Sequence, residues 1–376
     1  MEPSDDKELT LLRRAAAEFA RLQLAPKRQA NDACPFGPFF EEVVEKAFSL
    51  DFFHLTLPQD LGGTGHGITA LCRVLEAFSR EDASLAGILF THTLAQAVVL
   101  AAGEGRLLKQ RAQKAKAARE WLMAAAAFNN PGEIRTGVRA DPGANAYCLS
   151  GRLPYLVMGA VADRALIPAA VDGHPGYSFF LVDLESSRAR KSPPVLSLGF
   201  HACPAVDVDF DRCPGEILGG PGGGPALFGT VAPRMGLAAA AVSLGIMGGA
   251  LDEAVAYTRR RRQGGRAAIR WSELQMILAE MAVRLAVAEM AVSRACLAAE
   301  AAEPGWERVA RAAEIFVTQA ACEATVDGVQ ALGGVGYMKD FGQEKRLRDA
   351  QQAQSLLGLA PLKKLRYFRQ TAKLED

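Results

Sequence analysis

Apolar residues recur at helical spacing through the first third of the chain. Leu12, Ala16 and Phe19 stand four and three residues apart, so they share one face of a helix. The glycine-rich stretch 57–65 interrupts this periodicity with turn-forming residues and separates two such helices. The pattern predicts an N-terminal helical domain over residues 1–121.

The period changes in the middle of the chain. Val206, Val208 and Phe210 alternate with aspartates, which is typical of a strand with one buried face. We therefore predict a central β domain over residues 122–225. The glycine-rich run 219–225 is followed by no Lys-Ser/Thr pair and lies in no βαβ pattern, so it is interpreted as a linker and not as a phosphate loop.

Helical periodicity returns over residues 226–376, in long stretches rich in Ala, Leu and Met. Breaks fall at the glycine or proline pairs 264–265, 304–305 and 333–334. Four or five long helices between such breaks favour a C-terminal bundle. The predicted order of domains is helical, β, helical.

Charge and cysteine content narrow the possible partners. The 43 basic and 42 acidic side chains leave a net charge of +1, which favours neither a nucleic-acid nor an anionic-membrane partner. The N-terminus is charged and resembles no signal peptide, and we expect no apolar run as long as the ~20 residues of a membrane span, so a cytoplasmic location is expected. The seven cysteines form no CxxC pair or histidine spacing, which predicts reduced thiols and no metal site.

Four segments carry a resemblance to a known family. They are the turn L-P-Q-D-L-G-G-T-G at 57–65, the helix with Y-x-x-x-R-x-x-x-G at 244–265, L-A-E-M at 278–281, and D-G-V-Q-A-L-G-G-V-G-Y followed by R-D-A at 327–350. In this order and at these intervals they resemble the acyl-CoA dehydrogenase family over almost the whole chain. The resemblance implies an N-terminal helical domain, a central β barrel and a C-terminal four-helix bundle. It also implies tetramers that bind FAD near subunit boundaries.

The resemblance makes the last two bundle segments candidate FAD contacts. The Gly333-Gly334 pair lets the backbone approach a pyrophosphate, and Gln330, one turn before this pair, can hydrogen-bond the same ligand. A helix C-cap would have a similar sequence, so that interpretation stays open. Arg261 corresponds to the family arginine that reaches the FAD diphosphate of a neighbouring subunit. The alternative is a solvated helix end formed by the four arginines 259–262. By the same resemblance, Gly264 replaces the phenylalanine that is usual in the family.

The flavin-contacting segments of the β domain match less well. The family pattern T-E-P-x-x-G-S-D resembles only N-N-P-G at 129–132, and W-I-T-N-G aligns with Y-L-V-M-G at 155–159. By this alignment Asn129, Tyr155 and Val157 face the flavin. Val157 carries no hydroxyl for flavin N5.

The catalytic base of the family is missing from its usual place. Members of the family remove the α proton of an acyl thioester with the glutamate of Y-E-G-T, where this chain has Leu356, Leu357 and Gly358 in the first three places. Met235 stands at a second position that holds the base in some members. The catalytic residue is therefore unknown, and the three residues at 356–358 are candidates for binding the substrate. Glu133 is the carboxylate nearest in sequence to the flavin-contacting segment.

Three functions remain open from the sequence. The first is an FAD-dependent oxidoreductase with a shifted base or none, which dehydrogenates an acyl-CoA or acyl-carrier thioester in fatty acid metabolism and passes electrons to electron-transfer flavoprotein. The second is the base-less partner subunit of a heteromeric acyl-CoA dehydrogenase. The third is a non-catalytic scaffold that binds acyl thioesters or proteins. His92 lies in a region that borders the acyl pocket in the family, and it is interpreted either as a pocket residue or as a hydrogen-bonded helix residue.

Overall fold

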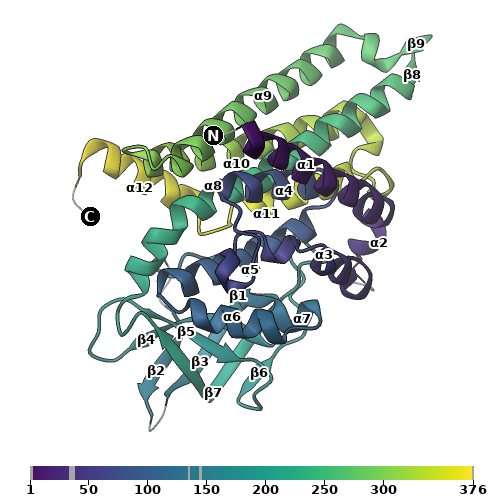
Figure 1. Ribbon diagram of the computed structural model, residues 1–376. Helices are drawn as coiled ribbons and strands as arrows, with labels where there is room; N and C mark the ends of the chain where they lie inside the picture. The colour runs from purple at the N-terminus through teal and green to yellow at the C-terminus, as the bar shows by residue number, and fades with distance from the viewer. Residues whose placement is uncertain (1–2, 34–38, 134–135, 144–145, 375–376) are drawn as a thin grey trace.

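A computed structural model describes residues 3–33, 39–133, 136–143 and 146–374. A helical region, a β domain and a second helical region follow one another along the chain (Figure 1). The predicted order of domains is therefore confirmed. Cys34 lies outside the described residues. The other six cysteines are free thiols, five of them buried.

Helices make up most of the described part of the N-terminal region. Its helices are α1 (Pro3–Phe19), α2 (Arg28–Asn31), α3 (Glu45–Ser49), α4 (Ile68–Glu81), α5 (Ala83–Ala101), α6 (Gly105–Lys114) and α7 (Ala118–Trp121). A single 3-10 turn, Gln59–Leu61, lies in the glycine-rich stretch before α4. Asp82 caps α5 by accepting the Ser84 N–H at 2.9 Å, which satisfies one of the free amides of the first turn.

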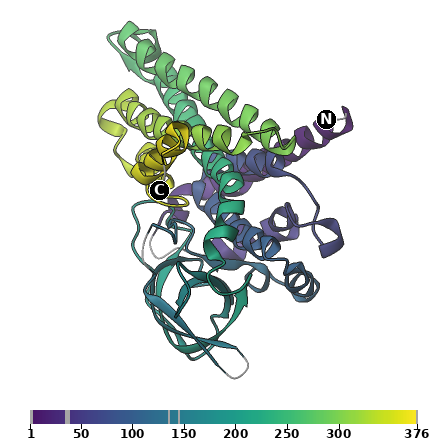
Figure 2. The ribbon, with the colours of Figure 1, turned by 90° about the vertical axis from the view of Figure 1, so that its left-hand side faces the viewer.

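The β domain is a sheet whose pairings close into a ring. Its strands are β1 (Met123–Ala125), β2 (Val138–Pro142), β3 (Tyr147–Val157), β4 (Arg164–Val171), β5 (Ser178–Asp183), β6 (Ala189–Lys191) and β7 (Ala205–Leu218). The ladder β3-β2-β4-β5-β7 is closed by a β3–β7 pairing, and the ring is seen nearly end-on in Figure 2. Val206, Val208 and Phe210 are buried on β7, as their alternation predicts.

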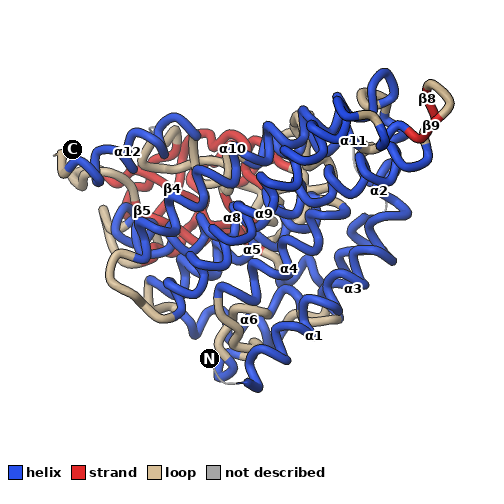
Figure 3. The backbone as a smooth tube through the Cα atoms, turned by 90° about the horizontal axis from the view of Figure 1, so that it is seen from above, coloured by secondary structure: helices blue, strands red, loops and turns tan. Residues whose placement is uncertain are grey.

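The C-terminal region contains the longest helices. They are α8 (Gly224–Arg260), α9 (Ser272–Glu300), α10 (Trp306–Leu332), α11 (Gln343–Ala353) and α12 (Ala360–Ala372). The predicted breaks are confirmed, because α8, α9 and α10 all end within a few residues of the glycine pairs or the Pro-Gly pair. A two-stranded turn, β8 (Arg262–Gln263) with β9 (Arg266–Ala267), joins α8 to α9 and stands at the outer edge of the molecule (Figures 1 and 3).

One expectation from the sequence was wrong. Two helices, Ala83–Ala101 and Gly224–Arg260, are long and apolar enough to cross a membrane, although we expected no such run. In both, 89% of the apolar window is buried inside the protein. A helix that is packed on every side is apolar on every side, and this accounts for their composition.

The R-D-A motif at 348–350, on α11, makes contacts with the N-terminal helices and with the β domain. Asp349 accepts the N–H of Phe200 at 2.8 Å and pairs with buried Lys345, which also contacts Asp82 at 3.0 Å. Arg348 makes an ion pair with Asp32 at 2.5 Å. Helix α11 is therefore anchored both to the N-terminal helices and to the loop before β7, and this fixes the segment that follows it.

Candidate functional site

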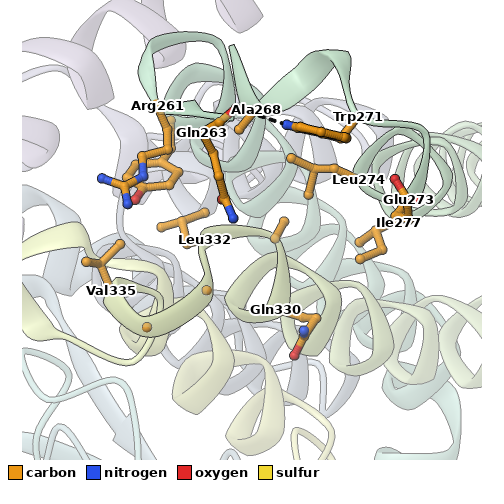
Figure 4. Close-up of a pocket in the computed structure, with 14 residues that line it drawn as sticks. Arg261, Gln263, Ala268, Trp271, Glu273, Leu274, Ile277, Gln330, Leu332 and Val335 are labelled. Carbon is orange, nitrogen blue, oxygen red and sulfur yellow. Dashed lines mark hydrogen bonds between the residues drawn. The ribbon is translucent and has the colours of Figure 1, made fainter. Parts of the chain in front are cut away.

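Four residues predicted to contact the cofactor lie around one cavity. Arg261 comes from the end of α8, and Gln330, Gly333 and Gly334 come from the end of α10. The cavity holds about 610 Å³, and Figure 4 shows Arg261 and Gln263 on its β8–β9 side, opposite Leu332 and Val335. Its lining also includes Tyr257, Ala268, Trp271, Glu273, Leu274, Ile277 and Ala331.

The chemistry of this cavity fits the diphosphate part of a dinucleotide. Gly333 has φ +65°, and a Cβ on either Gly333 or Gly334 would meet nothing within 4 Å, so this backbone is open to a ligand. The guanidinium of Arg261 is exposed and has no partner among the described residues. An unpaired guanidinium beside open glycine backbone is suited to phosphate oxygens.

An aromatic side chain that the sequence did not point to completes the cavity. The family pattern has a phenylalanine where this chain has Gly264, which adopts φ +58°. A Cβ on Gly264 would lie 2.8 Å from Cζ2 of Trp271, so the indole already fills that space. The Arg266 guanidinium lies over the Trp271 ring, 3.6 Å from its centroid. Trp271 therefore places an aromatic ring beside Gly264, in the lining of the cavity.

The β-domain candidates lie far from this cavity within one chain. Asn129, Tyr155 and Val157 belong to the β domain or the loop that follows β1, whereas the β8–β9 turn stands at the outer edge of the helices (Figure 1). The hydroxyl of Tyr155 accepts a hydrogen bond from Gln352 Nε2 at 2.7 Å, and burial raises its pKa. Val157 is fully buried in β3. Asn129 lines a small apolar cavity next to α5.

A second cavity, of about 450 Å³, lies beside Leu357. The β domain, α8, α10 and α12 all contribute to its lining, which consists of Asn130, Gly132, Tyr177, Pro225, Phe228, Gly229, Ala232, Arg311, Glu314, Ile315, Leu357, Lys363, Arg366 and Gln370. Leu357 adopts φ +61°, and its N–H donates to the carbonyl of Ala127 at 2.8 Å. Of the three predicted substrate residues, Leu357 alone lines this cavity among the described residues.

Glu133 lies close to this loop, but its carboxylate is already engaged. It accepts the N–H of Leu359 at 2.9 Å and makes an ion pair with Arg366. A Cβ on Gly358 would lie 2.7 Å from both carboxylate oxygens. Glu133 therefore holds the 356–359 loop in place, and its geometry does not favour the role of a free base.

Glu314 is the carboxylate that the sequence analysis missed. It lies on α10, is 7% exposed, and has Oε1 2.7 Å from the ammonium of Lys363. Lys363 also donates to the carbonyl of Leu356 at 2.5 Å. A Cβ on Gly236 of α8 would lie 2.6 Å from Glu314 Oε2. The available signal was an acidic residue on an otherwise apolar face of α10.

The ring of His92 is buried, and both of its nitrogens contact backbone groups. Its Nε2 lies 3.2 Å from the carbonyl of Phe53, and its Nδ1 accepts the N–H of Met123 at 3.2 Å. Complete burial lowers the pKa of His92 to about 3, so the ring is neutral. Of the two interpretations, the hydrogen-bonded helix residue is the one that agrees with these contacts. Within the described ranges no group of three potential metal ligands occurs.

Comparisons with known proteins agree with this architecture. Family models for the acyl-CoA dehydrogenase N-terminal and C-terminal domains match residues 6–116 and 231–359. The probable acyl-CoA dehydrogenase fadE25 of Mycobacterium leprae is 31% identical over 366 residues, which cover 94% of this chain and 91% of that protein. The cyclohexane-1-carbonyl-CoA dehydrogenase of Geobacter metallireducens is 27% identical over 98% of both chains. The butyryl-CoA dehydrogenase of Megasphaera elsdenii has the same fold, with a TM-score of 0.88 at 20% identity over 98% of both chains.

The fold and the sequence matches define the class of protein. The chain belongs to the acyl-CoA dehydrogenase family, as its motifs predicted. The family consists of flavoprotein oxidoreductases that bind FAD, and acyl-CoA substrates and electron-transfer flavoprotein partners are typical of its members.

Proposed function

We propose that the protein is an FAD flavoprotein that acts on an acyl-CoA or acyl-carrier thioester in the α,β-dehydrogenation class. The observation that carries this proposal is the unobstructed group formed by Arg261, Gln330, Gly333 and Gly334 around one cavity. Bound FAD would accept a hydride from the β carbon of the acyl group. The residues of this chain would bind the cofactor, orient the thioester and keep water out of the cavity beside Leu357.

The cofactor site is shared between two subunits in this proposal. The diphosphate-binding group lies at the outer edge of the helices and the flavin-facing candidates lie in the β domain, so one chain does not bring them together. Helix α9 supports the same idea, because Met276, Val283 and Met290 are each more than 60% exposed on it. An exposed apolar stripe of this kind is usually covered in an assembly. We therefore expect a dimer or a tetramer, the latter a homo- or heterotetramer.

A second candidate is the base-less subunit of a heteromeric acyl-CoA dehydrogenase. It is supported by the sequence motifs, which predict the family glutamate at the position where this chain has Leu357. In that case a partner subunit would supply the base, and this chain would complete the FAD site. Electron-transfer flavoprotein as the acceptor, a role in fatty acid metabolism and a cytoplasmic location belong to the proposal in either form.

The visible spectrum of the purified protein tests the cofactor. Oxidised flavin absorbs near ~450 nm, and we expect this band to remain with the protein after gel filtration. Sedimentation at micromolar concentration should give a dimer or tetramer. A monomer that takes up no FAD, alone or after co-expression with a glutamate-bearing homologue, would contradict both candidates and leave the scaffold function.

A further inference from the structure

We propose that Glu314 is the proton acceptor of the cavity beside Leu357 and that it removes the α proton of the bound thioester. This inference rests on the proposed function, because it assigns the base of that same site. Glu314 is the one carboxylate in the lining of this cavity among the residues that the structure describes.

The two oxygens of this carboxylate have different environments. Oε1 faces the ammonium of Lys363 at 2.7 Å. Oε2 has no hydrogen-bond partner in the described part of the chain and, unlike Oε1, is not fully buried. A carboxylate oxygen that is not fully buried and lacks a partner can accept a hydrogen bond or a proton from a ligand. Because Glu314 lines the cavity, Oε2 is available to a group bound there.

The carboxylate also lies between the two places where a base is expected. On one side, Lys363 joins it to the carbonyl of Leu356, the residue before Leu357. On the other side, its Oε2 approaches Gly236, the residue after Met235. Both expected positions carry apolar side chains, and α10 brings a carboxylate to the space between them.

The charge pair next to the cavity is not explained by stability. A buried ion pair gains little over apolar residues of similar volume, because desolvation offsets the Coulomb attraction. Lys363 is 8% exposed, so both charges of the pair are largely removed from water. The pair holds one oxygen of Glu314 in place and leaves the other without a hydrogen bond in the described part of the chain, as a positioned base requires.

The proposed step is a simple proton transfer. The Cα–H bond of the thioester breaks, the proton bonds to Oε2 of Glu314, and the electron pair stays on the substrate as the enolate. The carboxylate becomes a neutral acid, and its proton exchanges with solvent. In heavy water the reverse step returns a deuteron to the α carbon, so the step is observable without net dehydrogenation.

Deuterium uptake from heavy water tests this assignment. The purified, FAD-loaded oligomer is incubated anaerobically with butyryl-CoA and, separately, with octanoyl-CoA, and mass spectrometry measures α-deuterium. We expect exchange with wild type and a loss of roughly 10²–10⁴-fold in Glu314→Gln. Glu307→Gln, at an exposed residue on the same helix, should keep the wild-type rate.

A second variant, Gly236→Ala, tests the same assignment in case the Glu314→Gln protein does not fold. Gly236→Ala keeps the carboxylate but adds a Cβ within 2.6 Å of Oε2, and this should displace the oxygen and slow exchange. Equal exchange in wild type and Glu314→Gln would overturn the assignment. FAD-loaded wild-type protein that exchanges neither substrate would also overturn it while leaving FAD binding intact. Absence of the flavin band is a separate failure, that of the proposed function.

Discussion

Lys363 and Glu314 form a buried ion pair between α12 and α10, with 2.7 Å between Nζ and Oε1. The same ammonium donates to the carbonyls of Gln354 and Leu356, at 3.2 and 2.5 Å. One side chain thus connects the last helix, the bundle and the loop that contains Leu357. The position of this loop depends on that connection.

Removal of the ammonium should destabilise the protein. Lys363→Met leaves the Glu314 carboxylate buried without its partner, and breaking a buried pair in this way costs about 3–5 kcal/mol. The double variant Lys363→Met/Glu314→Met should lose less than the sum of the two single variants. Urea unfolding measures both effects. Exposed Lys364→Met, one residue further on, should change stability by no more than about 0.5 kcal/mol, and a similar loss there would contradict the role of the buried pair.

A glutamate introduced at residue 357, where the motifs predict the family base, should take over part of the role proposed for Glu314. Leu357→Glu in the Glu314→Gln background adds an acid to the lining of the same cavity, at a residue that is 4% exposed. We expect partial recovery of α-proton exchange, because the new base lacks its family neighbours. The α-deuterium assay measures it, and Leu357→Gln in the same background is the matched control. Recovery in both variants would mean that the carboxylate is not responsible.

Arg261 should contribute strongly to FAD affinity. Arg261→Ala removes hydrogen bonds between a charged donor and phosphate, which are worth about 1.5–3 kcal/mol and correspond to roughly ten- to hundredfold weaker binding. Arg259→Ala is the control, because Arg259 is also exposed but does not line the cavity. Titration of the apoprotein with FAD, followed by flavin fluorescence, gives both dissociation constants. An equal loss in the two variants would indicate a general charge effect.

We expect Trp271 to contribute to FAD binding in place of the aromatic residue that is absent at position 264. Trp271→Ala should weaken FAD binding by about 1–3 kcal/mol, as expected for loss of base–aromatic stacking, whereas Trp271→Phe should keep most of the affinity. Phe368→Ala, at an exposed aromatic residue on α12, serves as the control. Unchanged affinity in Trp271→Ala would show that the indole only fills the space above Gly264.

The contact between His201 and Asp32 should make stability depend on pH. The hydrogen bond from His201 to Asp32 raises the histidine pKa to about 9. Burial would raise the pKa of Asp32, but hydrogen bonds from His201 and Arg348 outweigh it and lower that pKa to about 2. The histidine contribution is complete below its ordinary pKa of 6.5 and is lost as pH rises through about 9. The aspartate contribution is present above 3.8 and is lost as pH falls through about 2.

Urea unfolding at a series of pH values measures this dependence. Wild type should be more stable at pH ~6 than at pH ~9.5, by an amount that His201→Gln removes. The variant retains a hydrogen-bonding side chain but cannot gain the charge. If the difference between the two pH values persists in His201→Gln, another group is responsible for it.

Features that depend on neighbours along the chain were predictable from the sequence. The alternation of Val206, Val208 and Phe210 predicts a half-buried strand, and the glycine pairs predict where α8 and α10 end, because strand and helix periods are local properties. The spaced motifs also pointed to the family, whose fold the structure has.

The candidate site depended on contacts between distant segments, and only the tertiary structure decided it. Glu314, Leu356 and Lys363 lie on three separate elements, and their meeting follows from how α10 and α12 pack around the loop. Glu133 was the carboxylate to which the sequence pointed, yet its oxygens are taken by Arg366 and a backbone N–H. No local pattern carries such information, because the burial and the partners of a charged side chain are set by packing between elements.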